Sequence, residues 1–193
     1  MKIDKSIKIK VDEGVYSPDQ DSYLLLDLIE VEEEEKVLEI GVGSGFISLH
    51  CLKKEADVTA VDKSDKALKN TKRNAEINGL DLRIKKSDLF SDIDDKYDVI
   101  IFNPPYLPKH EGLEIDDRWD GGERGDEVTM EFLENVENYL EKHGRVYLCF
   151  SDMAPLDNIK SYISQNFDVI NKKEQRFRFE NLYTYELKLV TSN

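Results

Sequence analysis

The sequence predicts an α/β fold: a mostly parallel sheet of seven strands, with helices on both faces and a C-terminal antiparallel hairpin. Apolar runs of strand length alternate with helical patterns through most of the chain, and a glycine-rich turn joins the first of these strands to a helix. Such alternation favours parallel strands, because each helix returns the chain across the sheet. The last two strand-like runs have no helix between them, so we expect an antiparallel pair at the sheet edge.

The expected elements follow from apolar periodicity and from residues that begin or end helices. Ser64 is placed to cap one helix and Asn78-Gly79 to end it, while His143-Gly144 is expected to end another. A chain of 193 residues fits one domain over residues 1–193. Strands are expected at 36–40, 57–62, 81–85, 97–102, 145–150, 167–171 and 182–190, and helices at 46 to about 54, 65–77, about 126–141 and 155 to about 166, with an acidic connector at 30–36 after a first helix.

Composition narrows the class of protein. The formal net charge of -14 disfavours direct binding to nucleic acid, which relies on Lys and Arg at the phosphates. Cys51 and Cys149 lie in apolar stretches and are expected to be reduced core residues. His50, His110 and His143 have no ligand spacing, so we expect helix-end or surface roles and no metal site. The absence of a long apolar run and of a signal peptide predicts a cytoplasmic protein without a membrane span.

The glycine-rich turn is the first candidate ligand site. Gly41, Gly43 and Gly45 allow the backbone to turn sharply and to approach a ligand closely. The spacing is Glu-x-Gly-x-Gly-x-Gly, which differs from the Gly-x-Gly-x-x-Gly of dinucleotide enzymes and gives no support for a pyrophosphate cradle. S-adenosylmethionine, which carries no phosphate, fits this turn better, and the alternative is a tight structural turn.

Acidic residues end the first two strands and follow the third. Asp62 lies about 20 positions beyond the glycine turn, where a carboxylate can accept hydrogen bonds from the hydroxyls of a ribose. Glu39 can orient the turn or attract the cationic end of a ligand. Asp88 either accepts from an adenine amino group or serves as a turn residue.

The run Asn103-Pro104-Pro105-Tyr106 follows a buried strand at the sheet edge where parallel sheets bind ligands. Prolines stiffen the chain and lack amide hydrogens, so nearby carbonyls are free to face a ligand. Carbonyl groups of Asn103 and Pro104 can hold both N–H bonds of a planar amide, on which Tyr106 can stack. The pattern predicts transfer to an amide or amino nitrogen, and the alternative is an ordinary proline turn.

Taken together, EIGVGSG at 39–45 and NPPY at 103–106 resemble the class I S-adenosylmethionine methyltransferases, specifically the HemK family of glutamine N5-methyltransferases. VYSPDQDSYLLL at 15–26 and WDGGERGDEV at 119–128 resemble the archaeal and eukaryotic branch, which modifies the class 1 peptide release factor. The resemblance covers nearly the whole chain. It implies a Rossmann-like methyltransferase fold and methylation of the glutamine in a Gly-Gly-Gln tripeptide.

The resemblance also implies site residues and partners. Asn103 would contact both cofactor and target amide, and Ser22 stands where the family commonly has Thr. A small zinc-binding activator subunit is implied as a partner beside the release factor substrate, and the extra N-terminal helical domain of bacterial members is not expected here. The cofactor contacts fall on Ser22, Glu39, Gly41, Gly43, Asp62, Asp88, Leu89 and Asn103, and the catalytic positions on Asn103, Pro104 and Tyr106.

Several alternatives remain open from the sequence. The NPPY motif is shared with adenine N6-methyltransferases of DNA or RNA, and a non-catalytic scaffold can keep the same fold. The segment 119–125 is either a lid over the target amide or an anchor for a long loop. The basic run at 172–178 is either an RNA contact or the solvated edge of the final hairpin.

Overall fold

The computed structural model describes residues 1–109, 116 and 118–190 and contains one seven-stranded sheet in the order β3-β2-β1-β4-β5-β7-β6. Every neighbouring pair from β3 to β5 is parallel, and β7 is antiparallel to both β5 and β6. The mostly parallel α/β fold with a C-terminal antiparallel hairpin is therefore confirmed. Its strands are β1 (Lys36–Ile40), β2 (Asp57–Asp62), β3 (Arg83–Lys86), β4 (Tyr97–Phe102), β5 (Leu140–Ser151), β6 (Phe167–Arg176) and β7 (Asn181–Leu189).

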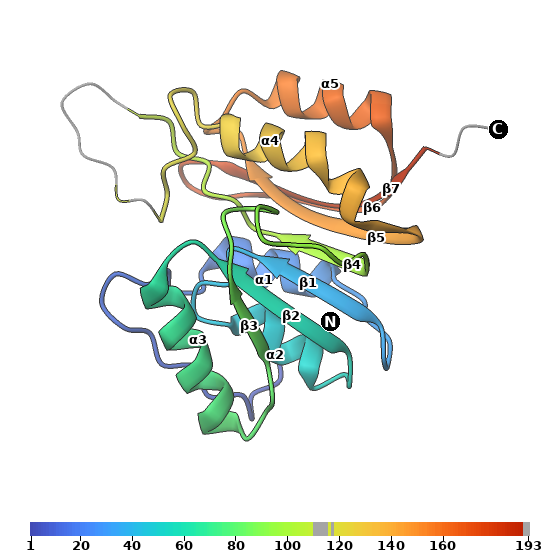
Figure 1. Cartoon of the computed structure of the whole chain (residues 1–193). Coiled ribbons are helices and arrows are strands. Elements are labelled where there is room, and N and C mark those ends of the chain that lie inside the picture. Colours follow the sequence, from blue (N-terminus) through green and yellow to red (C-terminus); the bar gives the residue numbers. More distant parts are fainter. Residues whose placement is uncertain (110–115, 117, 191–193) are drawn as a thin grey trace.

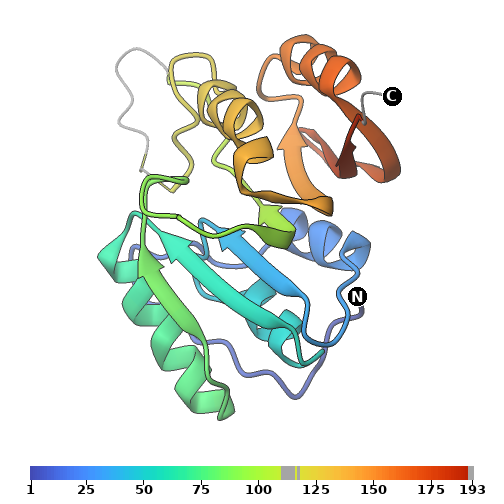
Figure 2. The same ribbon diagram turned by 45° about the vertical axis from the view of Figure 1, so that its right-hand side comes forward.

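Helices cover both faces of this sheet (Figures 1 and 2). Helices α4 and α5 lie on one side and α1, α2 and α3 on the other. Across the described residues, none of them is long and apolar enough to cross a membrane. Their bounds are α1 (Gln20–Leu28), α2 (Phe46–Leu52), α3 (Asp65–Asn78), α4 (Glu127–Asn135) and α5 (Leu156–Asn166), with a short 3-10 helix at Val136–Tyr139.

Strand β4 explains why the sheet needs both helical layers. Val99 and Ile101 belong to the apolar core beneath α1 and α2, whereas Ile100 and Phe102 belong to the core beneath α4 and α5. Successive side chains on a strand point to opposite faces, so a central parallel strand must be apolar throughout. Cys51 and Cys149 are buried and unpaired within the core beneath α1 and α2, as expected.

Helix α3 begins and ends where the sequence predicts. The Ser64 side chain accepts a hydrogen bond from the Ala67 amide, and Gly79 takes a left-handed conformation with φ of 64° after the last turn. A side-chain acceptor at the first turn and a left-handed glycine after the last one satisfy backbone groups that the helix itself leaves free.

The helix expected at about 126–141 is wrong in its C-terminal part. Helix α4 ends at Asn135, and β5 begins at Leu140, which pairs with Tyr97 of β4. Residues His143 and Gly144 lie inside β5 and do not end a helix. A Cβ atom on Gly144 would lie 2.8 Å from the Leu140 side chain, so glycine allows the close approach of Leu140 within the strand.

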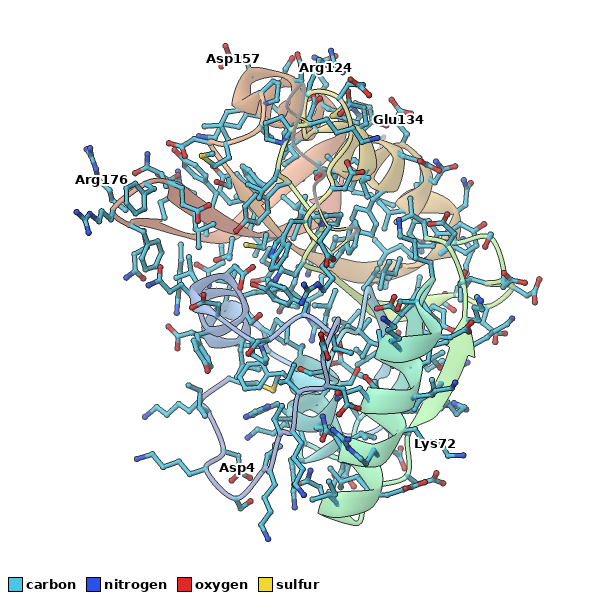
Figure 3. All side chains as sticks on the ribbon, turned by 90° about the vertical axis from the view of Figure 1, so that its left-hand side faces the viewer. Asp4, Lys72, Arg124, Glu134, Asp157 and Arg176 are labelled. Atoms are coloured by element: carbon cyan, nitrogen blue, oxygen red, sulfur yellow. The ribbon has the colours of Figure 1, made fainter. Side chains whose placement is uncertain are left out.

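The C-terminal hairpin is longer than predicted, and β6 forms its outer edge. Arg176 projects from the outer end of the hairpin (Figure 3). Within the basic run, Lys172 pairs with Glu174 and Lys173 with Asp27 of α1. These contacts agree with the interpretation of the run as a solvated sheet edge.

Phe132 of α4 offers a test of the apolar core beneath α4 and α5. Its ring is fully buried and lies with its centroid 5.5 Å from that of Phe90 and 4.8 Å from that of Phe102. The variant Phe132→Ala should lower the free energy of unfolding by about 3 to 5 kcal/mol, because it leaves a cavity. Urea unfolding followed by circular dichroism measures this loss. Met153→Ala, at a side chain that is 41% exposed, is the control and should change stability by less than about 0.5 kcal/mol; equal losses would contradict the packing argument.

Candidate active site

A cavity of about 990 Å³ opens at the carboxyl ends of β1, β2 and β4. Its walls include the glycine-rich turn, the NPPY run and an N-terminal segment that ends at Tyr16. Open parallel sheets bind their ligands at this edge, and the volume lies within the usual range for small-molecule and cofactor sites.

The glycine-rich turn adopts a backbone that other residues rarely take. Gly41, Gly43 and Gly45 have φ values of 67°, 55° and 84°. A Cβ atom on Gly45 would lie 3.0 Å from the Thr71 side chain, and one on Gly41 would face Phe102 at 3.4 Å. Glycine is therefore required both for the turn and for its close packing against α3.

Asp62 connects this turn to the end of β2. Its carboxylate accepts hydrogen bonds from the Gly43 amide at 3.0 Å and from the Ser64 amide at 2.8 Å. Burial raises the pKa of Asp62, with a smaller contribution from the Asp88 charge, while the two amide bonds oppose the shift. A carboxylate offers about four lone-pair positions, so Asp62 can accept two further bonds from a ligand in the cavity. Asp88 and Leu89 line the same wall.

Glu39 lies behind the cavity and is not part of its lining. Its buried carboxylate accepts hydrogen bonds from the Ser48 amide, at 2.8 Å, and from the Ser48 hydroxyl. Burial raises the pKa of Glu39 to about 8. The structure thus gives Glu39 a visible role in fixing α2 against β1, and its contact with the cofactor stays a prediction.

Ser22 is also outside the lining, whereas its neighbour Asp21 is part of it. The Ser22 hydroxyl donates to the Asp21 carboxylate at 3.2 Å, and the Tyr16 hydroxyl lies 2.6 and 2.7 Å from the two oxygens of that carboxylate. Sequence reasoning did not select Tyr16 or Asp21. The segment VYSPDQDSYLLL contained them, but no spacing within it distinguishes a wall residue from its neighbours.

The NPPY run follows β4, the strand next to β1, and supplies another part of the cavity wall. Asn103, Pro104 and Tyr106 all line the cavity, so the structure brings the three predicted catalytic residues together. The Asn103 side-chain oxygen is buried and accepts no hydrogen bond from the described residues. Burial raises the pKa of Tyr106, and the nearby carboxylates of Asp21 and Glu180 raise it further. Tyr106 therefore keeps its proton near neutral pH.

The loop after the NPPY run is tied to it by backbone bonds. Leu107 donates to the Trp119 carbonyl at 2.9 Å, and Gly121 donates to the Leu107 carbonyl at 3.0 Å. A Cβ atom on Gly125 would lie 2.6 Å from the Tyr106 carbonyl oxygen, which explains a glycine there. Trp119 lines the cavity as well, so this loop both anchors the chain and forms part of the wall.

Neither of the two described histidines lines the cavity. His50 is buried in α2, where its ring nitrogens contact the Phe46 carbonyl and the Asp4 amide. His143 is exposed on β5, and His110 lies outside the described residues. Within residues 1–109, 116 and 118–190, no group of three acidic, histidine or cysteine side chains is arranged to hold a metal ion.

The charges of the lining suit a cationic ligand that carries hydroxyl and amino groups. Five aspartates line the cavity, against two lysines and one arginine. S-adenosylmethionine has a positively charged sulfonium, an ammonium group and two ribose hydroxyls. The carboxylates of the wall can attract the two cationic groups and accept hydrogen bonds from the ammonium and the hydroxyls. The orphaned Asn103 oxygen and the left-handed glycines also fit a ligand that lies closely against the backbone.

The model of the methyltransferase small domain matches residues 6–182 of this chain. The chain belongs to the methyltransferase small domain family. This methyltransferase is 43% identical over 156 residues to the "Putative protein N5-glutamine methyltransferase" of Methanocaldococcus jannaschii, a match that covers 78% of this chain and 79% of that protein. It is 36% identical to the release factor glutamine methyltransferase of Streptococcus pneumoniae, over 72% of this chain and 55% of that protein, so this chain spans about half of the bacterial enzyme.

Solved methyltransferases share the fold of this chain. The ribosomal protein L11 methylase of Lactobacillus delbrueckii superposes with a TM-score of 0.70 at 22% identity, over 93% of this chain and 83% of that one. TrmK of M. capricolum, solved with S-adenosyl-homocysteine, superposes with a TM-score of 0.62 at 13% identity, over 86% and 66% of the two chains. The fold and the family together make this chain an S-adenosylmethionine-dependent methyltransferase of class I.

Other relatives act on other substrates by name. The ribosomal RNA small subunit methyltransferase C of Haemophilus influenzae is 36% identical over 81% of this chain and 46% of its own length. The names of the relatives therefore do not decide which group receives the methyl group, and the acceptor has to be inferred from the site.

The buried Glu39 carboxyl generates a prediction about pH. Because its pKa rises from 4.5 to about 8 on folding, the folded state binds a proton that the unfolded state has released between these values. The contribution of Glu39 to stability is therefore lost as the pH rises from about 5 to about 8. Glu39→Gln keeps an acceptor for Ser48 and removes the titration. Urea unfolding at several pH values should show the stability of wild type relative to Glu39→Gln falling across this window, and a constant or rising difference would contradict the assignment.

Proposed function

We propose that this methyltransferase transfers a methyl group to the side-chain amide nitrogen of a glutamine, and that its substrate is the Gly-Gly-Gln tripeptide of a class 1 peptide release factor. The unpartnered, buried oxygen of Asn103 carries the proposal. A buried polar atom without a partner is costly, and an N–H group of a bound substrate would satisfy it. The names of the relatives from M. jannaschii and S. pneumoniae support a glutamine as acceptor.

The chemistry requires alignment more than activation. The lone pair of an amide nitrogen is delocalised, so the nitrogen attacks only when it is held in line with the methyl group. S-adenosylmethionine supplies that electrophilic methyl group. The side-chain carbonyl of Asn103 and the backbone carbonyl of Pro104 would accept hydrogen bonds from the two N–H groups of the target amide. The Tyr106 ring would cover the flat face of that amide. Fixing both reactants in this way removes much of the entropic barrier.

The fate of the proton is consistent with an alignment role for the NPPY run. As the carbon–nitrogen bond forms, the sulfonium becomes a neutral thioether and the nitrogen gains a positive charge. The nitrogen then releases one proton to solvent and regains its planar amide form. Tyr106 and Tyr16 both have raised pKa values, chiefly because they are buried, so neither is available as a base near neutral pH.

A second candidate acceptor is the exocyclic amino group of adenine in nucleic acid. The same array of carbonyls fits it, and a relative named as a ribosomal RNA methyltransferase matches most of the chain. The net charge of -14 opposes it, because phosphate backbones need a basic surface. The zinc-binding activator subunit is implied by the family resemblance only. The cytoplasmic location and the single domain over residues 1–193 stay predictions of the sequence.

The substrate assignment has a direct test. Purified protein, with labelled S-adenosylmethionine, should methylate a class 1 release factor and should lose that activity when the glutamine of its Gly-Gly-Gln tripeptide is changed to alanine. Mass spectrometry should place the methyl group on that side chain. Methylation that survives the glutamine change, or that occurs on RNA and not on the release factor, would overturn the assignment.

Asn103→Ala tests the alignment role. We expect the variant to fold and to bind cofactor measurably, but to lose about 100-fold to 1,000-fold in the single-turnover rate, because one preorganised contact to the reacting group is gone. Pro104→Ala is the matched control. Alanine keeps the carbonyl and loses only stiffness, worth roughly 1 kcal/mol. A larger loss for Pro104→Ala than for Asn103→Ala would mean that the run is chiefly a structural turn.

A further inference from the structure

An extended N-terminal segment, residues 7–13, lies along α3 and is called the strap here. In Figures 1 and 2 the N-terminal part of the chain, in blue, runs past the lower helices before it reaches α1. Directly after the strap, Gly14, Val15 and Tyr16 form one wall of the cofactor cavity. The strap therefore leads directly into that wall, which Arg118 also contacts through the Val15 carbonyl at 3.2 Å.

Three asparagines on one face of α3 hold the strap by its backbone. Asn78 accepts from the Lys8 amide and donates to the Lys8 carbonyl, both at 2.8 Å. Asn74 makes the same pair of contacts with Lys10, at 3.0 and 2.8 Å. Asn70 accepts from the Asp12 amide at 2.7 Å and donates to the Lys10 carbonyl at 2.9 Å.

The register of this ladder follows from the geometry of the two segments. The asparagines recur every four residues, a rise of about 6.0 Å along a helix. The strap amides that they bind recur every two residues, a rise of about 6.6 Å along an extended chain. The two repeats nearly match, so successive rungs can form along one helix face. Lys72, on the opposite face of α3, points away from the protein (Figure 3).

Asn74 differs from the other two rungs. Its side chain is fully buried, and its amide group also donates to the Ser44 carbonyl of the glycine-rich turn at 2.8 Å. The neighbouring Thr71 hydroxyl donates to the Gly43 carbonyl at 2.9 Å. Asn78 is only half-buried and has no hydrogen bond to that turn. One buried amide thus joins the strap, α3 and the glycine-rich turn.

We propose that Asn74 is a positioning residue for cofactor binding, which couples the docking of the strap to the geometry of the glycine-rich turn. Asn74 does not line the cavity, so it acts through the two walls that it connects. Because such coupling is reciprocal, bound cofactor stabilises the docked strap and the docked strap strengthens cofactor binding. The inference concerns the cofactor and is independent of which substrate receives the methyl group.

Calorimetric titration with S-adenosylmethionine tests the proposal, with Asn78→Ala as the matched control for Asn74→Ala. We expect Asn74→Ala to weaken binding about tenfold or more, because several buried hydrogen bonds are lost on both walls. Asn78→Ala removes an outer, half-buried rung and a bond to the Asn74 carbonyl, neither of which reaches the glycine-rich turn, and should change affinity less than about threefold. A folded Asn74→Ala variant whose dissociation constant matches that of Asn78→Ala would overturn the proposal.

Hydrogen exchange provides a readout that loss of stability alone would not give. Saturating S-adenosylmethionine should slow exchange of the Lys10 and Asp12 amides in the wild type and should do so less in Asn74→Ala. If Asn74→Ala does not fold, Lys10→Pro replaces it, with Lys8→Pro as its control, because proline removes one strap donor and leaves α3 intact. Unchanged affinity in Lys10→Pro, or strap amides that cofactor fails to protect in the wild type, would overturn the proposal.

Discussion

The site depends on one backbone constraint, the left-handed conformation of the three glycines that follow β1. A chain that turns in this way presents amides and carbonyls to two sides. On one side the Gly43 amide fixes the Asp62 carboxylate, and on the other the Gly43 and Ser44 carbonyls accept from Thr71 and Asn74. The ends of β1 and β2 and the buried face of α3 are thereby held as one unit around the cavity.

Local patterns predicted much of this arrangement. The apolar strands, the glycine spacing and the caps of α3 each depend on residues close together in sequence, and the structure has them at nearly the expected positions. The end of α4 was mispredicted because 126–141 keeps a helical pattern up to a glycine. Leu140 instead enters the core beneath α4 and pairs with β4, a long-range contact that periodicity does not report.

The strap was missed for a related reason. Residues 7–12 alternate apolar and polar side chains, a pattern typical of an extended chain that the sequence analysis did not use. Their hydrogen-bond partners lie about 60 to 70 residues away on α3, which local patterns do not report. Asparagines every four residues on a predicted helix are a second signal, but asparagines are also common on solvated helix faces. Tyr16 and Asp21 were not selected because their place in the cavity wall depends on tertiary contacts of the strap and of α1, which local sequence patterns do not report.

Under the proposed function, the charges around the NPPY run would let this wall align a weak nucleophile without deprotonating it. Asp21 and Glu180 both raise the pKa of Tyr106, and Ser151 donates to Glu180 at 2.6 Å, which places a fixed negative charge beside a neutral phenol. A neutral ring keeps its apolar face for a planar group, while the carboxylates favour a nitrogen that becomes positive as it is methylated. An amide nitrogen gains acidity only after that charge develops, so under the proposed function electrostatic stabilisation of the methylated nitrogen would take the place of a base.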